Sequence, residues 1–190
     1  MKKLLLCLCM VTLVHAENPP LAGKKFGVEF NFPRLLTYND SWQSFSGTFS
    51  YFDHENKAEI ALPWVISKNQ SSNNDDDFLD ITTVDMQYRK FIDNKLNGVY
   101  FSGVGRLAHL DGNLRDQTAN QRTLKFGVGV GLGYRLFPQS NRFYWGTSLV
   151  MGRFIVGEND IYDNSGIDFL NFDDQAFFVD IEFLKFGYAF

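Results

Sequence analysis

The sequence predicts an all-β protein, an eight-stranded antiparallel up-and-down transmembrane β-barrel. Three observations lead to this fold class. Eight segments carry apolar side chains at every second position, which is the period of a β-strand. The connections between these segments alternate between long and short. Aromatic residues make up 16% of the 190 residues, with 20 phenylalanines among them, and such residues favour strands and water–lipid interfaces.

The first 16 residues, MKKLLLCLCMVTLVHA, predict a secretory signal peptide. Two lysines precede an apolar run, and the stretch ends at Ala16 in the small-residue pattern that precedes a cleavage site. The apolar run is too short to cross a bilayer as a helix, which takes about 20 residues. We therefore expect residues 17–190 to form the outer-membrane barrel domain. Cys7 and Cys9 both lie in the signal, so this domain contains no cysteine.

The first three predicted strands alternate regularly. In KFGVEFNF (25–32) and SFSGTFSYF (44–52), aromatic and aliphatic side chains occupy one face and small or polar side chains the other. AEIALPW (58–64) follows the same rule. Its Pro63 indicates a rim position or a bulge, because proline cannot donate a hydrogen bond to a sheet.

The middle strands are predicted at 79–91, 99–109 and 124–135. The last of these, LKFGVGVGLGYR, is the clearest, with large apolar side chains opposite four glycines, a lysine and an arginine. The segment 99–109 has apolar residues on both faces, so the sequence indicates a strand but leaves its facing open.

The final two strands are predicted at 143–154 and about 176–190. In the last one the apolar positions change parity between its first and second halves. A β-bulge near Phe183 and Leu184 would reconcile the two halves, because one extra residue restores the facing of the side chains.

The connections favour a membrane barrel. Long polar segments are expected at 33–43, 66–78, 110–123 and 155–175, and short ones at 53–57, 92–98 and 136–142. Outer-membrane barrels have short periplasmic turns and longer outer loops, whereas a soluble sheet has no reason to sort its hairpins by length. The sequence therefore predicts a location in the bacterial outer membrane.

At this point the chain resembles the small bacterial outer-membrane barrels of the OmpA and OmpX type. The resemblance rests on the signal peptide, the alternating connections and the ending FGYAF (186–190), and it identifies an architecture rather than one family. It implies that Phe186, Tyr188 and Phe190 form the terminal-strand signature recognised by the outer-membrane assembly machinery.

A soluble lipocalin-like barrel or sandwich is the alternative fold, since it is also built from about eight amphipathic strands. Its apolar face would point inward, and alternation alone cannot separate the two. The connection lengths and a set of aromatic residues placed at strand ends favour the membrane: Trp64, Phe91, Tyr134, Phe143 and Trp145.

The inward face of such a barrel would carry charges of both signs. The alternation assigns eight of them to the lumen: Glu29, Glu59, Asp85, Arg89, Lys125, Arg135, Asp180 and Glu182. Eight strands enclose an interior just wide enough for side chains to fill, so we expect a packed ion network. The alternative is a functional one, in which these charges form a gate or a proton path. The inward glycines of 124–135 leave space beside them. Long side chains from neighbouring strands fill this space in one interpretation, and a ligand cavity occupies it in the other.

The candidate catalytic and metal-binding residues are few. His109 lacks a nearby His-x-Ser arrangement, and Ser102 has the opposite parity on the same strand, so no catalytic residues are assigned. The acidic stretch 73–77 and the acidic residues between Glu158 and Asp174 lack EF-hand spacing. We expect them to be solvated surface segments, with no metal and no cofactor.

The sequence thus predicts a non-catalytic outer-membrane barrel with a structural or surface-interaction, adhesion-like role. The first alternative is a barrel that binds or passes a small hydrophobic ligand, and the second is a lipid A-modifying enzyme. The expected partners are outer-membrane lipids, lipopolysaccharide and the barrel assembly machinery. We expect a monomer that does not bind nucleic acid, because the formal charge is −4 and phosphate binding requires a basic surface.

Overall fold

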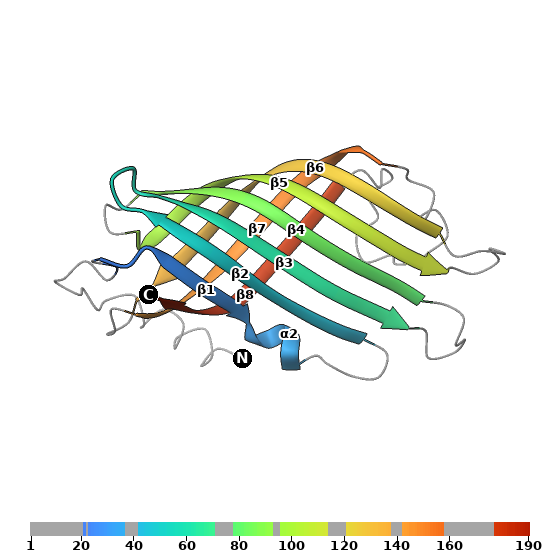
Figure 1. Ribbon diagram of the computed structural model, residues 1–190, viewed down its shortest axis with the longest axis horizontal. Helices are drawn as coiled ribbons and strands as arrows, with labels where there is room; N and C mark the ends of the chain where they lie inside the picture. Colours follow the sequence, from blue (N-terminus) through green and yellow to red (C-terminus); the bar gives the residue numbers. More distant parts are fainter. Residues whose placement is uncertain are drawn as a thin grey trace, which may run out of the picture.

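Eight antiparallel strands close into a barrel in the computed structural model, which describes residues 21, 23–36, 42–70, 78–92, 96–113, 121–137, 142–157 and 177–190 (Figure 1). Each strand pairs with the next along the chain, and β8 returns to pair with β1. The elements are β1 (Phe26–Asn31), α2 (Phe32–Leu36), β2 (Trp42–Asp53), β3 (Ala58–Gln70), β4 (Phe78–Phe91), β5 (Gly98–Asn113), β6 (Gln121–Leu136), β7 (Phe143–Val156) and β8 (Phe177–Ala189). The fold class predicted from the sequence is confirmed. None of the described helical segments is long and apolar enough to cross a membrane.

Several strands are longer than the crossing of about 9 to 11 residues that a bilayer requires. The strands β5 and β6 each contain 16 residues. Their pairing continues into polar sequence, where Asp111 lies opposite Arg122 and the two side chains form an ion pair of 2.8 Å. The predicted long connection at 110–123 is therefore partly strand, because backbone hydrogen bonding extends the hairpin past the apolar part of the wall.

The wall is apolar outside and polar inside. One outward side chain from each strand, between 43 and 63% exposed, illustrates the outer face: Phe30, Phe49, Leu62, Met86, Phe101, Val130, Met151 and Ile181. One inward side chain from each strand, at most 8% exposed, illustrates the inner face: Glu29, Thr48, Glu59, Gln87, Arg106, Lys125, Ser148 and Glu182. The facing of β5, which the sequence left open, is settled: Phe101 points outward and Arg106 inward.

A β-bulge lies in β8 where the parity of the sequence changes. Between the pairs Gly146 with Lys185 and Ser148 with Glu182, β7 advances two residues and β8 three. The extra residue in β8 lets Phe183 point outward, 73% exposed, while Lys185 points inward and is buried. The bulge predicted near Phe183 is confirmed.

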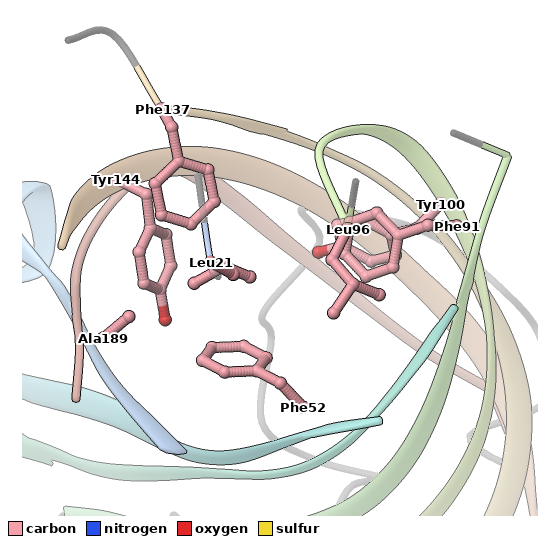
Figure 2. Packing of buried hydrophobic residues seen from close by; sticks show 8 residues of the cluster. All are labelled: Leu21, Phe52, Phe91, Leu96, Tyr100, Phe137, Tyr144 and Ala189. Atoms are coloured by element: carbon pink, nitrogen blue, oxygen red, sulfur yellow. The ribbon is translucent and has the colours of Figure 1, made fainter. Parts of the chain in front are cut away.

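An aromatic cluster closes the barrel at the end that carries the short connections (Figure 2). Its rings and aliphatic side chains point toward one another inside the mouth, and its members are Leu21, Phe52, Phe91, Leu96, Tyr100, Phe137, Tyr144 and Ala189. We call this cluster the plug. Trp64 and Phe91 were expected among the interfacial aromatic residues at strand ends, and both expectations are wrong: Trp64 lies in the middle of β3, and Phe91 is 3% exposed. Phe91 shares the inward parity of Arg89, which the aromatic type alone does not reveal.

The space beside the inward glycines of β6 is occupied by side chains from neighbouring strands. A Cβ atom on Gly133 would collide with the Tyr100 ring, and one on Gly131 with the Ser102 hydroxyl. The same is true of Gly127, whose added Cβ would meet the Phe178 ring. These glycines therefore make room for side chains of nearby strands on the inner face of the barrel.

We expect Gly133→Val to lower the free energy of unfolding by about 1–3 kcal/mol, because Tyr100 is held against Phe91 at 5.0 Å and cannot move aside without opening the plug. Gly103→Val is the matched control, since nothing lies within 4 Å of a Cβ at that position. Urea unfolding in detergent micelles measures both. Equal effects of the two substitutions would show that the lumen beside Gly133 is not packed.

Candidate functional site: the charged lumen

Ion pairs join five basic and five acidic side chains inside the barrel. We call this set the lumen network: Arg34, Arg89, Arg106, Arg135, Lys185, Glu29, Glu59, Asp85, Asp180 and Glu182. These residues come from α2 and from every strand except β2 and β7. Hydrogen bonds add the two missing strands, because Ser44 of β2 accepts from Arg34 at 3.3 Å and Ser148 of β7 accepts from Lys185 at 3.1 Å. The lumen network therefore connects all eight strands.

The half of the lumen network next to the plug is the more deeply buried. Arg135 Nη2 lies 2.8 Å from Glu29 Oε1 and 2.6 Å from Glu59 Oε2. Arg89 Nη1 lies 3.1 Å from Glu59 Oε1, and Lys185 Nζ lies 3.5 Å from Glu29 Oε2. The side chains of these five residues are at most 4% exposed. Two carboxylates thus share three cations in a space that water does not reach.

The other half is centred on Arg106. Its guanidinium donates to both carboxylate oxygens of Asp85, at 2.7 and 2.8 Å, and to Asp180 at 3.1 Å. Arg34 approaches Asp180 from α2 at 2.7 Å. Gln87 links the two halves, since its amide donates to Asp85 at 3.4 Å and its oxygen accepts from Arg89 Nε at 3.0 Å.

The lumen network is packed directly on the plug. The Arg135 guanidinium carbon lies 4.6 Å from the centroid of the Tyr144 ring, 5.1 Å from that of Phe91 and 5.4 Å from that of Phe52. Arg89 lies 5.3 Å from the centroid of the Tyr100 ring. Cations over aromatic faces are attracted by the ring quadrupole, so plug and network form one packed unit.

The structure places all eight lumen residues named from the sequence inside the barrel. Seven of them belong to the lumen network. Lys125 is fully buried as well but lies over the Phe154 ring, with Nζ 5.6 Å from its centroid. Sequence reasoning omitted Arg34, Arg106 and Lys185 from the set. The facing of β5, which the sequence left open, decides the position of Arg106; the bulge indicated Lys185, whereas nothing in the sequence placed Arg34.

The lumen network leaves little free space around it. A cavity of about 10 Å³ lies between Asp85, Gln87, Asp180 and Glu182. A buried water molecule requires roughly 10–15 Å³, so this cavity has room for one water at most. The lumen network holds the strands together by charge, because each of its cations has a carboxylate partner. Removing a cation or a carboxylate leaves the partner's buried charge uncompensated.

The remaining candidate residues lie apart from the lumen network. His109 is exposed on the outer face of β5, and Ser102 is buried on the inner face. Among the described residues there is no group of three or more side chains that could hold a metal ion. The acidic segments 73–77 and 158–174 lie outside the described residues. Phe186 and Phe190 point outward, about half exposed, and the Tyr188 ring packs against that of Phe143 with 5.0 Å between centroids. The role of these three residues in assembly stays a prediction.

The fold and the lumen define a small, closed, eight-stranded barrel with a charged, filled interior. No protein-family model matches the sequence, and no curated protein does. Among solved structures, the chain is similar to the N-terminal β-barrel domain of Pseudomonas aeruginosa OprF, with 15% identity and a TM-score of 0.47 over 88% of this chain and 98% of that one. At this distance the likeness has no bearing on function, which is argued below from this chain alone.

We expect Arg135→Met to lower the free energy of unfolding by about 3–5 kcal/mol, because it leaves Glu29 and Glu59 without their closest cation. Adding Glu59→Gln should restore part of the loss, since the double variant has one uncompensated charge fewer. Urea unfolding in lipid vesicles measures both.

The matched control is Lys68→Met, which breaks an exposed pair with Asp80 at 3.8 Å. Exposed pairs contribute about 0–1 kcal/mol, so this variant should remain close to the wild type. If Arg135→Met cost no more than Lys68→Met, the lumen network would not be what stabilises the barrel.

Proposed function

We propose that this protein is an integral outer-membrane barrel with a non-catalytic structural or surface-interaction role. The barrel holds the longer connections at the cell surface, where they meet the surroundings of the cell. The shorter connections and the plug face the periplasm. The partners in this proposal are outer-membrane lipids and lipopolysaccharide around a monomeric barrel, together with the assembly machinery that inserts it.

The observation that carries the proposal is the apolar outer face of all eight strands. A soluble barrel buries its apolar side chains and presents polar ones to water, and here the arrangement is reversed. Contiguous apolar surface on this scale is rare on soluble monomers. A closed barrel also leaves no strand edge unpaired, which is the condition for crossing hydrocarbon with strands.

Aromatic residues at one end of the wall support the same proposal. At the end with the short connections, Phe26 contacts Tyr51 at 5.7 Å and Phe190 at 6.1 Å between ring centroids, and Tyr188 contacts Phe143 at 5.0 Å. These rings face outward from β1, β2, β7 and β8, with Phe190 immediately after the end of β8. Aromatic girdles of this kind mark the boundary between lipid and water in membrane barrels.

The interior supports an anchoring role rather than passage or storage of a ligand. The sequence left open a ligand cavity beside the inward glycines of β6. In the structure the Tyr100 and Phe178 rings lie over two of these glycines, and the plug fills the mouth. For a lipid A-modifying enzyme, Ser102 and His109 were the residues to consider. They lie on opposite faces of β5, so neither can activate the other.

Labelling of intact cells tests the surface role. In a Gram-negative host, a cysteine introduced as Asp76→Cys should react with a membrane-impermeant maleimide added outside, because the 71–77 connection is assigned to the cell surface. A cysteine introduced as Glu55→Cys, in the 54–57 turn, should react only after the outer membrane is broken. A periplasmic marker that stays unlabelled confirms that the cells are sealed. Labelling at position 55 in sealed cells would show that the orientation is the opposite of the one proposed. If neither cysteine were labelled in sealed cells, surface exposure would be refuted.

A further inference from the structure

The outer wall contains an apolar groove at the seam between β7 and β8. Its volume is about 410 Å³, and it is lined by Phe143, Tyr144, Trp145, Leu184 and Phe186. Phe143 and Tyr144 begin β7, so the groove opens at the end of the barrel that carries the short connections and the plug. It lies on the lipid-facing side, because Phe143 and Phe186 are 63 and 49% exposed and point away from the lumen.

The groove adjoins the β8 bulge. At the bulge, one residue of β7 between Gly146 and Ser148 faces both Phe183 and Leu184. The strand bends locally at such a bulge. Leu184 is half-buried and lines the groove together with the exposed Phe186.

Two exposed cations lie at this end of the barrel, and Arg142 adjoins the groove. Arg142 immediately precedes Phe143, and its guanidinium donates to the Tyr188 hydroxyl at 3.1 Å. Its carbonyl oxygen accepts from the Ala189 amide at 2.7 Å, which fixes the backbone of Arg142 against the end of β8. Lys25, immediately before β1, is exposed, and its backbone amide donates to Phe190 O at 3.1 Å. Both positive charges therefore lie at the water boundary of the wall, and that of Arg142 is next to the apolar groove.

We propose that this seam is a binding site for an anionic phospholipid, with one acyl chain in the groove and the phosphate group at Arg142. The proposal rests on the membrane location proposed above. A groove continuous with the lipid-facing wall is filled by the lipid around it, and a guanidinium at the headgroup level favours a lipid of net negative charge over a zwitterionic one. The aromatic rings of Phe143 and Trp145 border the chain.

Trp145 provides a built-in probe for this site. Trp42→Phe with Trp64→Phe leaves Trp145 as the only tryptophan of the chain. We expect acyl-brominated phosphatidylglycerol in phosphatidylcholine vesicles to quench Trp145 at least twofold more than the same mole fraction of acyl-brominated phosphatidylcholine. Arg142→Gln should remove this difference, whereas Lys90→Gln, which changes an exposed cation of β4 at the same end, should leave it unchanged.

A second single-tryptophan protein, with Trp42→Phe and Trp145→Phe, is the control for ordinary lipid contact. Its Trp64 lies in the middle of β3 against Phe45, on the outer wall, and should be quenched equally by both lipids. Equal quenching of Trp145 by both lipids, or a preference that survives Arg142→Gln, would overturn the proposed site while leaving the membrane location intact. No quenching of Trp64 or Trp145 in the folded protein would instead refute the membrane location on which the site rests.

Discussion

The structure depends on the charge pairing inside the barrel. Because the middle of the outer wall is apolar on every strand, the charged side chains in the middle of the strands have only the lumen to occupy, and a buried charge is tolerated only with a partner. Five cations and five carboxylates meet this condition together. Their contacts link all eight strands, so the same ion pairs that compensate the buried charges also hold the strands of the barrel together.

The plug and the bulge follow from this constraint. The Arg135 guanidinium packs against three rings of the plug. The cation next to the mouth is therefore covered by aromatic faces and not by water. The bulge in β8 turns Lys185 inward to reach Glu29 and Glu182, and the same extra residue bends the outer wall beside Leu184. One local irregularity therefore completes the lumen network inside and shapes the lipid-facing groove outside.

Much of this fold could be predicted from alternation, because a period of two assigns each side chain to a face without knowledge of its neighbours. That rule placed Glu29 and Arg89 in the lumen and located the bulge at the change of parity near Phe183. It did not place Arg34, which reaches Asp180 from α2, an element the alternation does not cover. It also could not foresee the plug, since Leu21 lies before β1 and Leu96 in a connection, and the position of both depends on the closed barrel. Phe91 was misplaced because its aromatic character was weighed above its parity.

The most direct test of the account is the solvent that surrounds the middle of the wall. A nitroxide label on Val130→Cys, on the outer face of β6, should collide often with dissolved oxygen and rarely with a water-soluble nickel complex when the protein is folded in vesicles. A label on Glu55→Cys in the 54–57 turn should show the reverse. If the label at position 130 met the nickel complex as often as the label at position 55, the apolar wall would face water, and the chain would not be a membrane barrel.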